Sequence, residues 1–521
     1  MKFELNDDNV VVIVGSGAGG GTLAHELTAK GVRVICLEAG AKLEHLTDFV
    51  NDEVTMFNKL TWLDRRSATG NWNMAGSPMP SWTCKSVGGT SIHWAGTSLR
   101  ARDHEFKALD TYGAQTEASL ANWPISVKDL ASYYDQAESK LGVTGTHGIP
   151  ELPPNNNFLI FEAGAKKIGY KTASNSRMAI NPQARDGRGA CLQLGFCFAG
   201  CKMGAKWSTL YSEIPKAEET GKFELRPQST VLRIEHNDKG RVTGVLYADA
   251  KGVQHFQKAR AVCVAANSIE SARLLLNSAS ASFKDGLANS SGMVGRNYMR
   301  HVFGFVYGWF EKPVHMYRGS TCAGSLDDEN EHRPERGFVA GYHLQTISQH
   351  PVGMARAIAG SRGWGLPVAM GMDKYDHMAG IMIVGEDMPR LTNRVTLHAS
   401  EKDALGLPIP NVHYDDHPNN IAMRNHAYAQ GEKMYRSLGA LDVMRAPPPP
   451  ATHNLGTNRM SANARDGVVN GWGQSHDIKN LFVSDGSQFV TSTAENPTLT
   501  IVALAIRQAD YIARQLATQQ I

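Results

Sequence analysis

The feature that most constrains this chain is a glycine-rich turn that lies between a strand pattern and a helix pattern near its start. An apolar, β-branched run over Asn9–Val14 leads directly into the turn at 15–20, which reads Gly-Ser-Gly-Ala-Gly-Gly. An apolar helical pattern follows, and a second strand pattern at Val32–Leu37 ends at Glu38. A strand, a glycine turn, a helix and a strand within about 30 residues predict a Rossmann-like α/β unit.

Three glycines and one acid in this unit predict a bound dinucleotide. Gly15 permits the tight turn, Gly17 lets the backbone approach a pyrophosphate, and Gly20 lets the helix pack closely on the strand. The helix N-terminus then faces the phosphates. Glu38 follows Gly20 by 18 residues, near the distance at which an acid meets a ribose hydroxyl. A glycine turn without a ligand is the weaker alternative, because both strands and the acid are in place.

Three later segments add to this pattern. A second glycine-rich turn spans 85–96, and a strand pattern over 480–486 ends in Asp-Gly. Residues 495–498 (Glu-Asn-Pro-Thr) precede a helical pattern with an apolar residue every three or four positions. This order predicts Asn496 as the helix N-cap and Pro497 as the first helical residue.

Taken together, the motifs resemble the glucose–methanol–choline (GMC) oxidoreductase family over nearly the whole chain. Besides the first glycine turn, the segments that carry the resemblance occur in family order: 87–96 (VGGTSIHWAG), 265–271 (AANSIES), 295–297 (GRN), 453–457 (HNLGT) and 485–498. The resemblance implies an α/β (α+β) fold in which a Rossmann-like FAD-binding domain is joined to a discontinuous antiparallel-sheet substrate domain. It also implies FAD as the cofactor.

The same resemblance implies which residues contact FAD. Asp485 and Gly486 are expected beside the ribityl phosphate, and the 496–498 turn beside the flavin ring. The full expected set is Gly15, Gly17, Ala18, Gly20, Glu38, Gly88, Gly89, Thr90, His93, Trp94, Ala95, Val231, Ala266, Asp485, Gly486, Pro497 and Thr498. His93 occupies a position where some family members bond FAD covalently, and a non-covalent loop contact is the alternative.

Strand and turn patterns predict how the domains are arranged. Residues 231–265 have the pattern of a meander that ends in a buried strand, and strand patterns at 301–310, 337–344, 379–384, 394–398 and 405–414 suggest the substrate sheet. A helix is expected near 419–438, and four prolines at 447–450 form a stiff linker. The predicted domains are an FAD-binding domain (1–100, 205–300 and 450–521), an iron–sulfur loop (185–206) and a substrate-binding domain (120–184 and 301–449).

Oxidation of an alcohol to a carbonyl needs a base for the hydroxyl proton and an acceptor for the hydride. Histidine suits the first role because its pKa lies near neutrality. The chain has 19 histidines, most of which are expected at the surface or in packing. His453 precedes Asn-Leu-Gly-Thr, where the resemblance places the family's base, and Asn496 occupies the partner position. We therefore expect His453 to be the general base and Asn496 to orient the substrate hydroxyl, a role compatible with an N-cap.

Three of the seven cysteines fall within 11 residues: Cys191, Cys197 and Cys201 form a C-x5-C-x3-C pattern among glycines. Ligands this close on a flexible loop can converge on one metal centre. Structural thiols, a zinc site and an iron–sulfur cluster remain open, although zinc lacks an adjacent fourth ligand. The spacing resembles that of the family's iron–sulfur branch, the large subunits of bacterial sugar dehydrogenases, which implies a [3Fe–4S] cluster.

The branch resemblance implies the reaction. A cluster near a flavin favours a dehydrogenase over an oxygen-using oxidase, and residues 195–210 resemble glucoside 3-dehydrogenase large subunits, which oxidise the C3 hydroxyl of glucosides and disaccharides. A C1-oxidising glucose dehydrogenase, a fructose or gluconate dehydrogenase and an FAD sugar oxidase are the alternatives. Side chains expected to contact a sugar are Asn297, His301, Tyr342, His343, Gln345, Trp364 and Asn393.

Composition limits the partners. A net charge of +3 from 53 basic and 50 acidic residues disfavours nucleic acid, and no apolar run is long enough for a transmembrane segment. The first residues do not resemble a signal peptide, and no C-x-x-C-H binds a c-type haem in this chain. The branch resemblance implies a small subunit with an export signal, a cytochrome c electron acceptor and a periplasmic location; without a partner, the cytoplasm is expected.

Overall fold

A five-stranded parallel sheet forms the centre of the first structural unit in the computed structural model, which describes residues 1–71 and 79–521. Its strand order is β17-β9-β1-β2-β5. The bounds are β1 Val11–Val14, β2 Val34–Leu37, β5 Phe223–Arg226, β9 Ala261–Val264 and β17 Leu481–Val483. Every residue of β1, β2, β9 and β17 is buried, as expected for parallel strands with both faces covered. The sheet therefore joins three distant stretches of the chain.

Four helices pack around this sheet. Helix α1 packs on α13, α13 packs on α6, and α8 packs on α1. Their bounds are α1 Ala18–Ala29, α6 Val127–Leu141, α8 Glu213–Glu219 and α13 Thr498–Ala517. The predicted strand–turn–helix–strand unit is confirmed. The predicted N-cap is wrong, because α13 begins at Thr498 with Pro497 as its cap and without a side-chain cap.

The predicted meander is correct for its first two strands only. β6 (Thr230–His236), β7 (Val242–Ala248) and β8 (Gln254–Lys258) form a three-stranded antiparallel sheet. The apolar strand β9 leaves this sheet and pairs with β1 and β17 instead. Its four residues are buried, so its place is inside the parallel sheet, whereas β8 has one buried residue in five and suits an edge.

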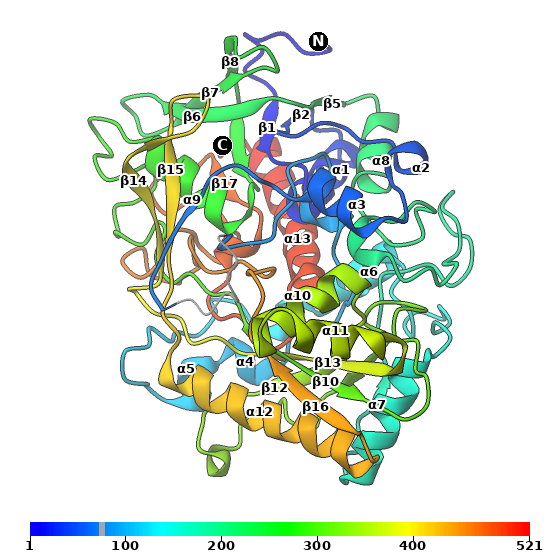
Figure 1. The fold of residues 1–521 in the computed structure, drawn as a ribbon. Helices are drawn as coiled ribbons and strands as arrows, with labels where there is room; N and C mark the ends of the chain where they lie inside the picture. Colours follow the sequence, from blue (N-terminus) through cyan, green and yellow to red (C-terminus); the bar gives the residue numbers. More distant parts are fainter. Residues whose placement is uncertain (72–78) are drawn as a thin grey trace.

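The second structural unit is a six-stranded antiparallel sheet with the order β16-β10-β13-β12-β11-β4. The bounds are β4 Ser174–Asn175, β10 Val302–Trp309, β11 Gly324–Leu326, β12 Tyr342–Thr346, β13 Met378–Gly385 and β16 Asp442–Ala446. Helices α12 (Pro418–Ser437) and α7 (Asn156–Lys167) cover it, and α12 lies along the lower edge of the molecule in Figure 1. A second helical pair, α10 (Pro351–Arg362) and α11 (Leu366–Asp373), packs against β16.

Two strands predicted for this sheet lie elsewhere. β14 (Arg394–Lys402) pairs with β15 (Pro408–His413), and β15 pairs with β3 (Ser67–Thr69), in a separate sheet beside α9 (Asn267–Asn277). The physical reason is burial: all eight residues of β10 are buried, whereas β14 has one buried residue in nine and cannot occupy the interior of the larger sheet.

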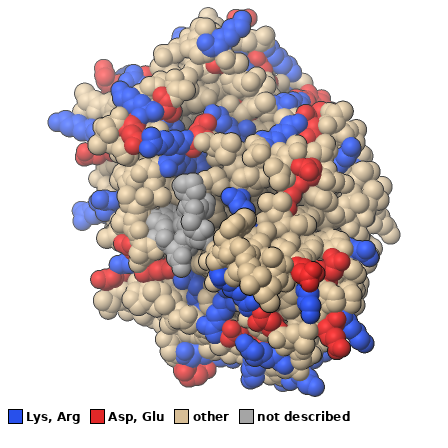
Figure 2. Space-filling view, in the orientation of Figure 1, with Lys and Arg blue, Asp and Glu red and all other residues tan. Residues whose placement is uncertain are grey.

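The remaining helices are short, and they are α2 His45–Asp48, α3 Glu53–Leu60, α4 Asp103–Phe106 and α5 Ala108–Tyr112. Within 1–71 and 79–521, no helix combines the length and the apolar character needed to span a bilayer. Basic and acidic residues are interspersed over the face shown in Figure 2. The predicted fold class, a Rossmann-like unit joined to an antiparallel sheet, is confirmed. The domain boundaries stay predictions.

Candidate active site

A cavity of about 620 Å³ connects the two units. At one end it is lined by the carboxyl ends of β1 and β2, through Val14 and Leu37. At the other end it reaches Phe303 on β10 and Met382 on β13. A ligand that fills this cavity would contact both sheets at once.

The first end of the cavity is built to receive phosphate. Gly17 caps α1 without a side-chain hydrogen bond, so the first N–H groups of the helix face the cavity. A Cβ atom on Gly17 would meet no atom within 4 Å, whereas one on Gly19 would lie 1.7 Å from the Ser484 carbonyl oxygen and one on Gly20 2.0 Å from that of Gly15. Gly17 therefore leaves room for a ligand, while Gly19 and Gly20 permit close packing.

Glu38 is fixed at the cavity wall by three hydrogen bonds. Its Oε2 accepts from the Ser16 N–H (3.0 Å) and from Ser16 Oγ (2.7 Å), and its Oε1 accepts from the Gly40 N–H (2.9 Å). Burial raises the pKa of this carboxyl above its ordinary value. Oε1 keeps a free lone pair, so it can accept a further hydrogen bond from a ribose hydroxyl.

The second glycine turn lies against the first. Gly88 adopts a left-handed conformation (φ 98°), and its N–H donates to Ser16 Oγ at 3.0 Å. His93, 2% exposed, stacks on Trp82 with ring centroids 4.7 Å apart. Its Nε2 is buried without a hydrogen-bond partner, and burial lowers its pKa to about 3. A neutral, unpartnered ring nitrogen in the cavity wall suits a flavin contact; a covalent bond there stays a prediction.

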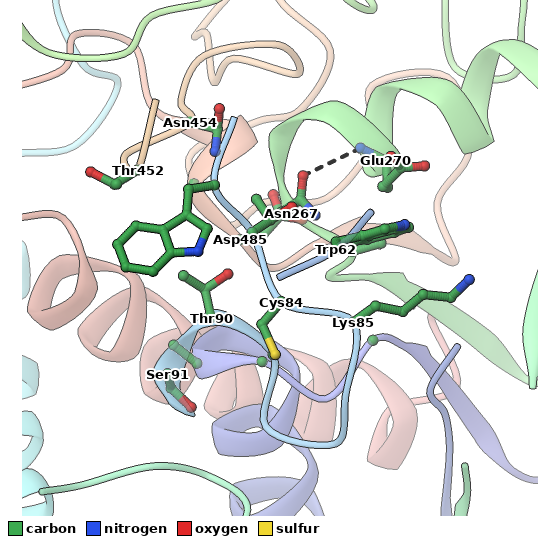
Figure 3. A pocket seen from close by; sticks show the side chains of 18 of the residues that line it. Trp62, Cys84, Lys85, Thr90, Ser91, Asn267, Glu270, Thr452, Asn454 and Asp485 are labelled. Carbon is green, nitrogen blue, oxygen red and sulfur yellow. Dashed lines mark hydrogen bonds between the residues drawn. The ribbon is translucent and has the colours of Figure 1, made fainter. Parts of the chain in front are cut away.

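Fifteen of the predicted FAD contacts line the cavity. They are Gly15, Gly17, Ala18, Glu38, Gly89, Thr90, His93, Trp94, Ala95, Val231, Ala266, Asp485, Gly486, Pro497 and Thr498. Gly20 and Gly88 do not line it; Gly20 packs on Gly15 and Gly88 binds Ser16. Figure 3 shows lining side chains from separate segments, with Cys84 and Lys85 on one loop and Asn267 and Glu270 on α9.

Asn267, which was not among the predicted contacts, also lines the cavity. It lies at the start of α9, just beyond the carboxyl end of β9, and has a positive φ of 69°. Ligands of open α/β sheets bind at the carboxyl ends of the strands, so correct placement of β9 in the parallel sheet would have identified it. The orphaned His93 nitrogen, the open space at Gly17 and the bonded Glu38 all fit a dinucleotide such as FAD.

His453 and Asn496, predicted to be catalytic, line the same cavity. The Nδ1 of His453 lies 2.8 Å from the Nδ1 of His301, and the Nε2 of His301 lies 2.9 Å from the Ser492 carbonyl oxygen. Burial, with His301 and His343 nearby, lowers the pKa of His453 well below its ordinary 6.5. The ring is therefore neutral at neutral pH, as a general base must be.

Asn496 is oriented by a buried amide. Its Oδ1 accepts from Gln345 Nε2 at 2.6 Å, and Gln345 Nε2 also lies 2.7 Å from His343 Nε2. Because the Oδ1 is occupied, the Nδ2 group is the side-chain donor that Asn496 can offer toward the cavity. The side chain acts on the site from a backbone turn and does not cap the helix.

The predicted sugar-contacting side chains do not line the cavity. His301 bonds to His453, and Gln345 bonds to His343 and to Asn496. Tyr342 bonds to His426, and Trp364 is 78% exposed. The other two are also engaged elsewhere, Asn297 with Ser119 and Asn393 with Asp415. Their expected contact with substrate is wrong, since paired polar side chains along a sheet cannot be told from substrate contacts by composition alone.

The part of the cavity wall that the large antiparallel sheet and its neighbouring segments contribute is mainly apolar. The side chains are Phe303, Phe305, Ile347, Met382 and Pro449, with Gln349 and Thr452 as polar members. The ring of Phe303 lies 5.2 Å from that of His453, centroid to centroid. This wall would make mainly apolar contacts with a substrate, and few of its side chains can form hydrogen bonds.

The three clustered cysteines line a second, smaller pocket together. Backbone N–H groups of Gln193 and Lys206 donate to the sulfurs of Cys191 and Cys201, both at 3.4 Å. Among the described residues, the groups whose ligand atoms all lie within 4.8 Å of one another do not include these three sulfurs. N–H donors to sulfur are one feature found at iron–sulfur sites.

Lys206 joins this pocket to the large cavity. The residue is 1% exposed, and its Nζ donates to the carbonyl oxygens of Ile92 (2.7 Å), Trp94 (2.5 Å) and Cys197 (2.7 Å). Burial lowers the pKa of this ammonium group to about 8. One side chain thus holds the His93 loop and the cysteine loop together.

One buried carboxyl group, Glu105, supports the backbone that precedes Asn496, and a second, Glu386, lies within 4.8 Å of it. Glu105 accepts from the N–H groups of Ala494 and Arg102, both at 2.6 Å, and Glu386 accepts from the hydroxyl of Tyr112 at 2.7 Å. Burial raises the pKa of Glu105 to about 7 and that of Glu386 well above 4.5. Burial and the nearby Glu105 carboxylate both favour the protonated form of Glu386.

Comparisons with known proteins agree with this geometry. Family models described as GMC oxidoreductase match residues 12–303 and 389–505. The chain is 32% identical to 2-methyl-1,2-propanediol dehydrogenase of Mycolicibacterium austroafricanum, covering 98% of this chain and 96% of that protein. It is 29% identical to the fructose dehydrogenase large subunit of Gluconobacter japonicus, covering 97% and 98%.

A solved structure supports the fold. The formate oxidase of Aspergillus oryzae RIB40, a protein with modified FAD, superposes with a TM-score of 0.67 at 17% identity. The match covers 98% of this chain and 99% of that one. At this identity the similarity establishes the overall fold alone.

Proposed function

This chain belongs to the GMC oxidoreductase family, and on that premise we propose that it is an FAD-dependent dehydrogenase that oxidises a CH–OH group of a sugar or a related alcohol. The observation that carries the proposal is the single cavity that joins the phosphate-facing end of α1 to His453 and Asn496. Fold alone does not determine function, but a dinucleotide pocket that opens onto a neutral, buried histidine has the parts this oxidation needs.

Each residue has a defined task. FAD, when bound, supplies the hydride acceptor. His453 accepts the proton of the substrate hydroxyl, and the Asn496 amide donates a hydrogen bond to the same oxygen. The apolar wall around Phe303 excludes water, which strengthens both interactions.

Replacement of the base tests this assignment. We expect His453→Ala to retain FAD and to lower turnover by about 10²–10⁴-fold, the usual contribution of general-base catalysis. FAD content, read by absorbance, is the control. A variant that keeps FAD and loses less than about tenfold in turnover contradicts the role of His453.

We further propose that Cys191, Cys197 and Cys201 hold a [3Fe–4S] cluster. The shared pocket, the N–H donors to two of the sulfurs and the C-x5-C-x3-C pattern support it. Iron and acid-labile sulfide in the purified protein, with an EPR signal of the oxidised cluster, are expected, and Cys197→Ser should remove the signal. Zinc without sulfide would overturn the proposal.

An electron exit through such a cluster favours a dehydrogenase that serves a protein acceptor. We propose a small subunit with an export signal and a cytochrome c as partners, and hence the periplasm as location; the relative named as a large subunit supports a multi-subunit assembly. Co-expression with the neighbouring small-subunit gene should increase the yield of exported protein. Peroxide formation in air, with no response to an artificial acceptor, would instead favour an oxidase.

Two proposals for the specific substrate can be distinguished by turnover measurements. The cysteine motif favours C3 oxidation of glucosides or disaccharides, whereas the apolar wall beside His453 favours a small branched diol such as the one named for the Mycolicibacterium relative. Turnover of a methyl glucoside or sucrose with a dye acceptor supports the first, and turnover of 2-methyl-1,2-propanediol with no glucoside activity supports the second. Oxidation of glucose alone would indicate attack at C1.

A further inference from the structure

His453 lies at the end of a hydrogen-bond chain whose direction is fixed at its other end. The Ser492 carbonyl oxygen can only accept a hydrogen bond, so the His301 Nε2 that lies 2.9 Å from it carries a proton and donates. Neutral histidine carries one ring proton, which leaves the Nδ1 of His301 as an acceptor.

His301 is held neutral by its surroundings. It is 1% exposed, and burial lowers its pKa to about 4. His453 and His343 are its titratable neighbours, and no carboxylate among the described residues bonds to either His301 or His453. A proton on Nε2 and a lone pair on Nδ1 are therefore its resting state.

The hydrogen bond between the two histidines sets the tautomer of His453. The Nδ1 of His301 accepts, so the Nδ1 of His453, 2.8 Å away, is the nitrogen that donates. A neutral His453 then has its lone pair on Nε2, the nitrogen that His301 leaves available to the cavity.

We propose that His301 is a positioning residue that fixes His453 in the Nδ1–H tautomer and so makes Nε2 the base. The inference rests on the proposed role of His453. In the proposed reaction, the substrate O–H bond breaks and its proton goes to Nε2, while FAD, when bound, would supply the acceptor for the hydride that leaves the carbon. His453 becomes an imidazolium whose Nδ1–H still donates to His301.

The backbone at His301 indicates that its placement is enforced. The residue has φ 66°, a left-handed conformation that non-glycine residues seldom adopt, just before β10 begins at Val302. The preceding Arg300 N–H donates to the buried Asp387 at 2.7 Å, which anchors the turn. Strain of this kind persists where the surrounding structure holds it and is concentrated at functional sites.

Two substitutions separate tautomer control from packing. In His301→Gln, the side-chain NH2 can donate to Ser492 and the carbonyl can accept from His453, so turnover should stay within a few-fold of wild type. In His301→Leu, neither bond can form, and kcat should fall by about 10²-fold or more with KM little changed, as expected for a base with an uncontrolled tautomer. FAD content should be unchanged in both.

A direct measurement keeps the inference testable if the leucine variant does not fold. ¹⁵N NMR of the histidine-labelled wild-type protein, with His453→Gln to assign the signal, should show a protonated Nδ1 and an unprotonated Nε2. A proton on Nε2, or wild-type kcat in His301→Leu, overturns the proposal. If His453→Ala itself keeps its turnover, the base assignment fails instead, which distinguishes the two outcomes.

Discussion

At the scale of single residues, the sequence indicated the two side chains proposed to act on the substrate but not the side chains that bond to them. His453 and Asn496 were identified from short motifs near the C-terminus, and both line the cavity. Their partners His301 and Gln345 lie about 150 residues away in the chain and were assigned to substrate contact. No spacing rule connects residues so far apart, because the sheet that brings them together is built from non-local pairings.

The pH dependence of activity follows from the environment of His453. Since burial and two neighbouring histidines lower its pKa well below 6.5, the base stays unprotonated as the pH falls through that value. We expect kcat/KM to stay level from neutral pH to below about 6.5 and to decline only in more acidic solution, because this ratio reports the free enzyme's ionisations.

The measurement is a pH profile of kcat/KM at saturating acceptor. FAD content across the same range serves as the control for cofactor loss. An acidic limb centred at or above 6.5 would contradict the expected environment of His453.

At the scale of elements, local patterns were sufficient where an element and its neighbours are adjacent in sequence. The β1–α1–β2 unit was predicted because its three parts follow one another within 30 residues. The sheet positions of β9, β14 and β15 were not predicted, because the periodicity of a strand indicates which face is buried and not which strand it pairs with. The polar composition of β14 (RVTLHASEK) is a sequence signal that could have placed it outside the large sheet.

The first turn of α1 offers a matched pair of substitutions. In Gly17→Ala the new Cβ meets no protein atom within 4 Å and φ is −64°, so the free energy of unfolding of the apoprotein should change by less than about 1 kcal/mol. The methyl group occupies the space expected for pyrophosphate, so FAD affinity should fall at least about tenfold.

In Gly20→Ala the Cβ would lie 2.0 Å from the Gly15 carbonyl oxygen and 3.1 Å from the Ala265 Cβ. The apoprotein should lose about 1–3 kcal/mol or fail to fold, as overpacked positions do. Urea unfolding and flavin absorbance distinguish the two variants. Equal FAD binding by Gly17→Ala and wild type would show that no ligand approaches this turn.

At the scale of the whole molecule, buried histidines and buried carboxyl groups both narrow the pH range over which the folded protein is stable. Histidines with lowered pKa values, such as His93 and His301, remain neutral in the folded protein but gain protons when unfolded below about 6.5, so they favour unfolding as the pH falls. Glu105 and Glu386 have raised pKa values and keep protons that the unfolded chain releases, so they favour unfolding as the pH rises.

Glu386→Gln should remove part of the stability loss that the buried carboxyl groups cause as the pH rises. The amide carbonyl can still accept from the Tyr112 hydroxyl and the Gly341 N–H, but it has no proton to release. Wild type loses up to about 1.4 kcal/mol per pH unit above its unfolded-state pKa of about 4.5 from this residue, and the variant does not. The advantage of the variant should therefore grow between pH about 5 and about 8.

Urea unfolding of both proteins at the two pH values measures this difference. Tyr112→Phe, which removes one hydrogen bond without removing the carboxyl group, is the control for lost packing. A stability difference that is the same at both pH values would show that Glu386 is ionised in the folded protein.

The ammonium group of Lys206 has a consequence for how the protein matures. Its three carbonyl partners belong to two loops, one beside the large cavity and one that carries the clustered cysteines. Ordering either loop sets this shared donor in place and lowers the entropic cost of ordering the other. By thermodynamic reciprocity, filling one site would then favour filling the other, so we expect FAD incorporation and assembly of the proposed cysteine centre to be cooperative.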